Sequence, residues 1–174
     1  MFGLNIKLLQ LRNSQLVKSQ YSNRPNTSFK DSKSIGIIFT SEGKTKFNSI
    51  KAFVKSLQDL NKNVDVLCFV PKNEENHEFK YDYFSENNLT LSGIIESEEV
   101  KKFEKQPFDY LYLLDFNINP FIMNVVLKSN AVCRVGFFSD ESSQILDFMI
   151  NASGNDYSRE FEELLKYTKD LNHQ

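Results

Sequence analysis

The clearest structural signal in the chain is Phe108–Phe138, which reads FDYLYLLDFNINPFIMNVVLKSNAVCRVGFF. Two apolar runs within it, Tyr110–Leu114 and Ala131–Phe138, have the length of strands that are covered on both faces. Between them, Asn119-Pro120 is a start signal for a helix that continues to about Lys128. The stretch therefore predicts a strand, a helix and a second strand of a parallel sheet.

The same alternation extends through most of the chain. Strands are expected at residues 35–40 and 64–70 and, from a weaker pattern, at 89–95. Helices are expected at about 44–61, 97–105 and 156–171, whereas 145–150 suits either a sixth strand or a short helix. Residues 71–88 are polar, with an aromatic cluster at Tyr81, Tyr83 and Phe84, and are interpreted as a long excursion. This order predicts a Rossmann-like doubly wound α/β fold with a mainly parallel sheet of five or six strands.

The amino-terminal segment differs from the rest in charge. Apolar residues at steps of three and four predict an amphipathic helix over about 3–20, followed by a polar linker that contains Pro25. Through Ser34 there are six basic residues and one acidic residue, a net charge of +5, and the remaining 15 basic and 22 acidic residues give −7. We therefore divide the chain into a basic helix and linker, 1–34, and one Rossmann-like domain, 35–174.

Length and composition narrow the class of protein. With 174 residues, 40 % of them hydrophobic, the chain has the size and composition of one globular domain. No apolar run approaches the roughly 18 residues of a membrane span, and the polar residues near the start do not suit a secretory signal. A cytoplasmic protein is expected. Cys68 and Cys133 lie in apolar runs, which favours free buried thiols, and neither a metal nor a cofactor is indicated.

Gly43-Lys44-Thr45 invites comparison with a phosphate-binding loop, because such loops end in Gly-Lys-Thr after a strand. That motif also needs a glycine five residues before its second glycine, and Ile38 occupies this position. A turn from a strand into a capped helix is the favoured interpretation.

A second candidate site comes from the geometry of open parallel sheets, which bind ligands beyond the carboxyl ends of their strands. The residues expected there carry hydroxyl, carboxylate and amide groups: Thr40, Ser41, Asp115, Asn117, Ser139, Asp140 and Glu141. Both histidines, His77 and His173, fall in polar segments and are expected to be solvated. Without a histidine base, hydrolase chemistry on a serine or cysteine is not indicated, and no catalytic residue is assigned.

Two resemblances add to this interpretation. Phe108-Asp109-Tyr110-Leu111, Asp115, 119–128 and Arg134-Val135-Gly136-Phe137 resemble a segment in the amino-terminal half of heptosyltransferase-like GT-B glycosyltransferases, which implies a Rossmann-like half-fold. The chain lacks residues for the second domain that holds the sugar nucleotide in those enzymes. A longer resemblance, which includes Tyr83-Phe84-Ser85, residues 146–150 and the closing helix, is to a domain-of-unknown-function family of small Bacteroidota proteins and implies a cytoplasmic bacterial protein.

Three functions follow as hypotheses. The leading one is a non-catalytic binding or adaptor protein whose amino-terminal helix docks a protein partner, with Lys7, Arg12, Lys18 and Arg24 as candidate contacts. The first alternative is a small enzyme or protein that binds a nucleotide or sugar nucleotide at the carboxyl edge of the sheet, near Asp115. The second is association with RNA or the ribosome through the basic segment, with rings supplied by Tyr21 and Phe29.

Overall fold

Parallel strands form the centre of the fold. A computed structural model describes residues 2–20, 28–72, 80–154 and 156–171, and within these ranges it contains one six-stranded sheet of order β3-β2-β1-β4-β5-β6. All neighbouring strands are parallel, in agreement with the predicted doubly wound α/β fold. The strands are β1 (Ser34–Thr40), β2 (Asn63–Val70), β3 (Asp82–Ser85), β4 (Tyr110–Leu113), β5 (Cys133–Phe137) and β6 (Phe148–Ile150).

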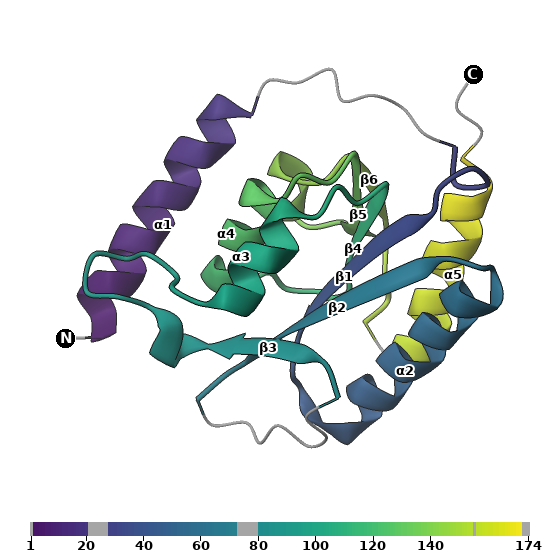
Figure 1. Cartoon of the computed structure of the whole chain (residues 1–174), viewed down its shortest axis with the longest axis horizontal. Coiled ribbons are helices and arrows are strands. Elements are labelled where there is room, and N and C mark those ends of the chain that lie inside the picture. The colour runs from purple at the N-terminus through teal and green to yellow at the C-terminus, as the bar shows by residue number, and fades with distance from the viewer. Residues whose placement is uncertain (1, 21–27, 73–79, 155, 172–174) are drawn as a thin grey trace.

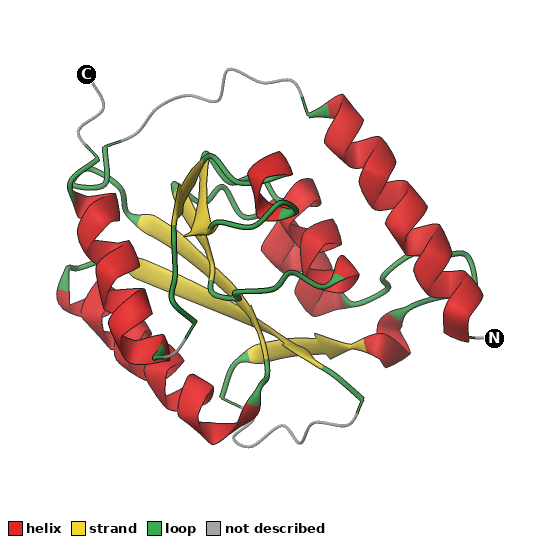
Figure 2. Ribbon diagram, turned by 180° about the vertical axis from the view of Figure 1, so that it is seen from behind, coloured by secondary structure: helices red, strands yellow, loops and turns green. Residues whose placement is uncertain are grey.

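Helices cover both faces of this sheet. Figure 1 shows α2 and α5 on one face, α3 and α4 on the other, and α1 outside α4 as a further layer. Figure 2 shows the same layers from behind, with α1 at the far side of the molecule from α2 and α5. The helices are α1 (Phe2–Ser19), α2 (Gly43–Asp59), α3 (Glu98–Lys105), α4 (Pro120–Lys128) and α5 (Tyr157–Lys169), with short 3-10 turns η1 (Glu86–Asn88) and η2 (Ser142–Gln144).

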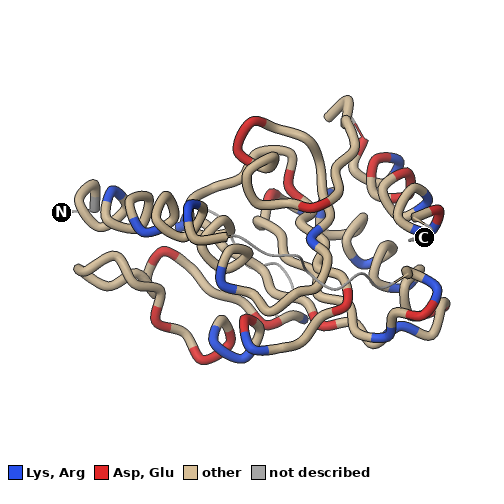
Figure 3. The backbone as a smooth tube through the Cα atoms, turned by 90° about the horizontal axis from the view of Figure 1, so that it is seen from above, with Lys and Arg blue, Asp and Glu red and all other residues tan. Residues whose placement is uncertain are grey.

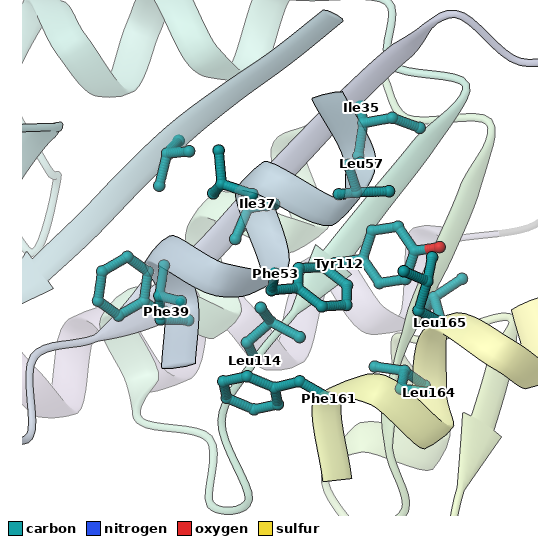
Figure 4. Close-up of a cluster of buried hydrophobic side chains, with 14 of the residues drawn as sticks. Ile35, Ile37, Phe39, Phe53, Leu57, Tyr112, Leu114, Phe161, Leu164 and Leu165 are labelled. Carbon is teal, nitrogen blue, oxygen red and sulfur yellow. The ribbon is translucent and has the colours of Figure 1, made fainter. Parts of the chain in front are cut away.

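The strand residues alternate between two cores. Ile35, Ile37 and Phe39 of β1 point toward α2 and α5, where Figure 4 shows them with side chains such as Phe53 and Phe161. Ile38, on the opposite face of β1, belongs to the second core with residues of α3, α4 and α1. Because both faces are buried, the strands read as continuous apolar runs, which is the pattern that the sequence shows.

Two helix starts follow the predicted capping chemistry. The side chain of Ser97 accepts a hydrogen bond from the backbone N–H of Val100, and α3 ends at Lys105 as expected. The side chain of Asn119 accepts from the N–H groups of Phe121 and Ile122, with Pro120 at the first helical position. These caps satisfy amide donors that a helix leaves without partners in its first turn.

The region between β2 and α3 differs from the prediction. The strand expected at 89–95 is wrong: a single antiparallel bridge joins Leu89 and Ile95, and the residues between them form a tight turn. The third strand is instead Asp82–Ser85, within the stretch interpreted as an excursion. Phe84 is buried in the second core, whereas Tyr83 is 43 % exposed. We define residues 88–96 as a hairpin, whose Ile95 is buried whereas its Leu91 and Ile94 are exposed.

The end of the expected linker is also built into the fold. Phe29 is buried and packs edge-on against Tyr110, so its predicted role as an exposed ring for RNA is wrong. The Nζ atom of Lys62 donates to the carbonyl oxygens of Phe29, Lys30 and Ser32 at 2.7, 3.2 and 2.6 Å. Residues 28–32 are thus held against the start of the sheet, and Tyr21 lies outside the described residues.

Candidate functional site

The conventional ligand position in this fold lies between β1 and β4. The strand order reverses there, and ligands of open α/β sheets bind in the crevice beyond the carboxyl ends of the strands at such a point. Thr40 ends β1 and Ser41 follows it, and Asp115 and Asn117 follow β4. The structure therefore brings Thr40 and Asp115 together at the predicted edge.

Asp115 is the centre of a buried network. The backbone N–H of Thr40 donates to its Oδ1 at 2.9 Å, and the Thr40 hydroxyl donates to its Oδ2 at 2.6 Å. Lys46 Nζ lies 2.6 Å from Asp115 Oδ1 and 3.1 Å from Glu42 Oε1. The side chains of Lys46 and Asp115 have no exposed surface. Side chains of the protein thus occupy the crevice between β1 and β4.

Two neighbours extend this network. Asn119 Nδ2 donates to Thr40 Oγ1 at 2.8 Å while its Oδ1 caps α4, which ties β1 to the start of that helix. The Tyr157 hydroxyl donates to Glu42 Oε2 at 2.8 Å, and its ring stacks on Phe116. Each side chain of the Asp115 network is therefore held by at least one polar contact at this edge.

Two titratable groups near this edge, Tyr157 and Cys68, have raised pKa values. Burial, followed by the hydrogen bond to Glu42, raises the pKa of Tyr157 to about 12. Burial, followed by the charge of Asp115, raises the pKa of the Cys68 thiol to about 12. Because a thiolate or phenolate is the reactive form, neither group supplies a nucleophile near neutral pH.

Lys46 is the important residue that the sequence interpretation missed. It lies on the same helical face as Ile50, Phe53 and Leu57, at steps of four, three and four. A lysine on the apolar stripe of a helix indicates a buried cation that needs an acidic partner. Gly43, Lys44 and Thr45 form the first turn of α2. The expected side-chain cap is absent, because Glu42, at the cap position, makes no capping bond.

The remaining predicted edge residues are less closely connected. Ser41 is buried, and its N–H donates to the carbonyl oxygen of Phe69. Asn117 is exposed. The 139–142 turn bonds within itself: the Ser142 N–H donates to Ser139 Oγ, and the Ser139 N–H donates to Ser142 Oγ. Within that turn, Asp140 and Glu141 are exposed.

The second candidate region is α1, which packs along α4. Leu9 is fully buried, and Asn13 is 2 % exposed. Asn13 Nδ2 donates to the Pro120 carbonyl at 2.8 Å, and Asn124 Nδ2 donates to Asn13 Oδ1 at 2.7 Å. The sequence did not show whether this helix packs on its own domain, and the structure shows that it packs on α4.

The carboxyl end of α1 is tied down by a buried arginine. Arg134 NH1 donates to Gln20 Oε1 at 2.7 Å, and its NH2 donates to the carbonyl oxygens of Leu127 and Ser129, both at 3.2 Å. Gln20 Nε2 also donates to the Leu127 carbonyl at 2.7 Å. One residue of β5 therefore joins the ends of α1 and α4.

The hairpin lies directly against α1. A Cβ atom on Gly93, whose φ is +73°, would stand 2.7 Å from Leu8 Cβ and 2.8 Å from the Leu9 nitrogen. Arg12 Nε donates to the Ser92 carbonyl at 3.3 Å. Glycine is needed at this position for both its backbone conformation and its close approach.

The surface formed by α1 and the hairpin is apolar and cationic. Leu4, Leu11, Leu91 and Ile94 are 65, 56, 73 and 42 % exposed. A cavity of about 500 Å³ opens beside them, lined by residues of α1, the hairpin and α4: Arg12, Gln15, Leu16, Ser19, Gly93, Ile94, Ile95, Asn124 and Lys128. The predicted docking residues Lys7, Arg12 and Lys18 are exposed, and Arg24 lies outside the described residues.

Other expectations concern thiols, metals and membranes. The two cysteines form no disulfide with each other; Cys68 is buried and Cys133 is half-buried. In the described ranges, no group of three or more His, Cys, Asp or Glu side chains could hold a metal ion. None of the described helices has the length and apolar character required to cross a membrane. His77 and His173 lie outside the described residues.

The parallel sheet, its strand order and its helices on both faces define a Rossmann-like α/β protein. The chain belongs to the "Family of unknown function (DUF6913)", which matches residues 6–171. The matched range includes most of α1 as well as the whole sheet, so the helix falls within the region that defines the family. No curated protein and no solved structure matches the chain.

Proposed function

We propose that this chain is a non-catalytic, cytoplasmic bacterial adaptor that binds a protein partner on the outer face of α1 and on the 88–96 hairpin. One observation carries the proposal. Of the eight large apolar side chains that are exposed in the described residues, four lie on these two adjacent segments: Leu4, Leu11, Leu91 and Ile94. Apolar side chains gathered on one exposed surface are typical of interaction sites, whereas scattered ones are not.

The charges on α1 favour a protein over RNA. Lys7 and Lys18 are eleven positions apart, about 16 Å along a helix at 1.5 Å per residue. Phosphate binding needs several cations held close together, and it does not use exposed leucines. The burial of Phe29 removes a ring on which a base could stack.

The carboxyl edge of the sheet offers less support for a bound nucleotide or sugar nucleotide, the alternative expected from the geometry of open parallel sheets. A ligand between β1 and β4 would have to displace Lys46 and Asp115, whose side chains have no exposed surface. Separating a buried ion pair leaves a charge without its partner, which costs several kcal/mol.

The experiment compares two sets of surface substitutions in the full chain. Removing α1 would uncover the apolar surface of α4, so point variants are preferable to truncation. Leu4→Ser/Leu11→Ser/Leu91→Ser changes the proposed surface, and Phe138→Ser changes an exposed aromatic elsewhere, 54 % exposed, as the matched control. Each variant is used for affinity purification from the source cells, with urea unfolding to check stability.

A partner recovered by the parent chain and by Phe138→Ser, but lost from the triple variant, supports the proposal. Equal recovery of every partner by all three chains would rule out this surface as the docking site. Loss of the partner from Phe138→Ser alone would instead place the binding site near the carboxyl end of β5.

A further inference from the structure

On the basis of the proposed function, we infer that the partner contributes an acidic amphipathic helix. One of its apolar side chains enters the cavity between α1, the hairpin and α4, and its carboxylates face the cations of α1. Three features of the structure support this partner chemistry: the spacing of exposed side chains, the lining of the cavity and the distribution of charge.

The exposed side chains of α1 have the spacing that a second helix requires. Leu4, Leu11 and Lys18 recur at intervals of seven, and Lys7 lies three positions from Leu4. Residues seven apart lie on one side of a helix after two turns, the repeat by which one helix packs along another. All four side chains are exposed, because the opposite face, with Leu9 and Asn13, packs against α4.

The cavity beside this stripe has an apolar floor and a cationic rim. Leu16, Ile94 and Ile95 supply apolar surface, whereas Arg12 and Lys128 supply the cations. Its volume of about 500 Å³ is within the range of sites that enclose a ligand group. The cavity has room for an apolar side chain carried on a helix, while the backbone of that helix stays above α1.

Charge identifies the polar part of the partner. Figure 3 shows cations along α1, and the helix contains Lys7, Arg12 and Lys18 with no acidic residue. Lys128 already pairs with Glu104 at 2.9 Å, so Arg12 is the rim cation that faces a partner. Arg12 Nε bonds the hairpin, and a guanidinium has five N–H donors in total. Carboxylates complement this surface.

A protein helix fits better than an anionic membrane. A helix that lies in a membrane interface inserts its main apolar face. In α1 this face, which includes Leu9, packs against α4. The exposed leucines alternate with lysines, which suits contact with a partner of matching pattern and does not suit a hydrocarbon phase.

The test titrates ¹⁵N-labelled full chain with three synthetic peptides and records amide shifts. The first peptide has leucines at intervals of seven, flanked by glutamates. In the second, lysines replace the glutamates, and in the third, serines replace the leucines. Vesicles of phosphatidylserine and phosphatidylcholine form a fourth arm. Gly93, which lines the cavity, reports on the proposed site, and Gly43 reports on the carboxyl edge of the sheet.

We expect the acidic peptide to shift the amides of Gly93 and Ile94 and to leave that of Gly43 unchanged. Arg12→Glu should weaken this binding roughly tenfold, because reversal of a rim charge turns an attraction into a repulsion. Lys44→Glu, an exposed lysine at the start of α2, is the matched control and should change the affinity by less than about twofold.

Each other outcome overturns the inference. These outcomes are equal binding of the basic or the leucine-free peptide, shifts centred on Gly43, binding to vesicles alone, and no shift at Gly93 up to about 1 mM peptide, a weak-binding limit. If the surface variants lose their cellular partner while the acidic peptide fails to bind, the proposed function is kept. Only the inference that the partner contributes an acidic helix is then rejected. If those variants keep every partner, the proposed function itself fails.

Discussion

The carboxyl edge of the sheet and the surface of α1 are built in opposite ways. At the edge, Lys46 and Asp115 are paired at 2.6 Å, and neither side chain has exposed surface. On α1 and the hairpin, apolar side chains such as Leu11 and Leu91 are more than half exposed. At the switch point, where this fold usually binds ligands, the structure has a buried ion pair, whereas exposed apolar side chains lie on α1 and the hairpin.

The largest expected effect comes from breaking the edge network. Asp115→Ala leaves Lys46 buried with only the partly exposed Glu42, and it removes the acceptor of two Thr40 donors. We expect a loss of about 3–5 kcal/mol in the free energy of unfolding, measured in urea, because an unpaired buried charge remains. Lys46→Met/Asp115→Leu, which removes both charges, should be less destabilised. A loss below about 1 kcal/mol for Asp115→Ala would contradict a stabilising role for the pair.

The second largest loss of stability is expected from disturbing the contact between the hairpin and α1. Gly93→Ala places a Cβ atom 2.7 Å from Leu8 Cβ in a backbone conformation with φ of +73°, so the hairpin must move. We expect about 2–3 kcal/mol of destabilisation and loss of partner binding. Gly154 is the matched control: its φ is +74° and a Cβ atom would meet nothing within 4 Å, so Gly154→Ala should lose only about 1 kcal/mol. Equal losses of stability in Gly93→Ala and Gly154→Ala would show that the close approach of Gly93 to α1 is not the cause.

A smaller effect is expected from the polar contact that aligns α1 with α4. Asn13→Ala removes the bond to the Pro120 carbonyl and leaves the amide of Asn124 without its acceptor. Unfolding in urea should show a loss of about 1–2 kcal/mol. Asn13→Ala/Asn124→Ala should then lose less than the sum of the two single variants, because they share one hydrogen bond. Strict additivity would show that the two amides act independently.

The smallest effect concerns alkaline pH. Burial raises the pKa of Cys68 from 9.0 to about 12, so above pH 9 the unfolded chain releases a proton that the folded chain keeps. This contribution to stability is complete below pH 9 and declines as the pH rises toward 12. Part of the alkaline decline comes from tyrosines such as Tyr112 and Tyr157, whose pKa values burial also raises. The part due to Cys68 should reach about 1.4 kcal/mol at pH 10 and be absent from Cys68→Ala. Cys133→Ala, at a half-buried position, should retain it. The same pH profile in Cys68→Ala and the parent chain would exclude this thiol.

The sheet was predictable from the sequence because its strands are buried on both faces and its helices carry local start signals. Ser97 and Asn119 accept hydrogen bonds from residues at most three positions away, and Pro120 occupies the first position of its helix. Such local roles can be predicted from the sequence. The misplaced third strand shows the limit of this reasoning. Residues 82–85 form a strand of only four residues in which Phe84 alone is buried. The apolar residues of 89–95 are divided between the second core, which includes Ile95, and the exposed surface, which includes Leu91 and Ile94.

The candidate site was predictable only in part. Asp115 follows an apolar strand, and sheet geometry alone brings it close to Thr40. Its pairing with Lys46 depends on how the first turn of α2 meets β4, 69 positions away in sequence. The sequence alone does not show which face of α1 is exposed, because both faces contain leucines. The structure shows that the face with Leu9 and Asn13 is buried against α4.

Site-specific photo-crosslinking in living cells tests directly whether a partner binds on α1 or at the carboxyl edge of the sheet. A benzophenone amino acid replaces Leu11, on the exposed face of α1, or Asn117, which is exposed beside the switch point. We expect a protein adduct from position 11 that disappears when Arg12→Glu is added, and no adduct from position 117. An adduct from position 117 with none from position 11 would contradict it and return the binding site to the edge of the sheet.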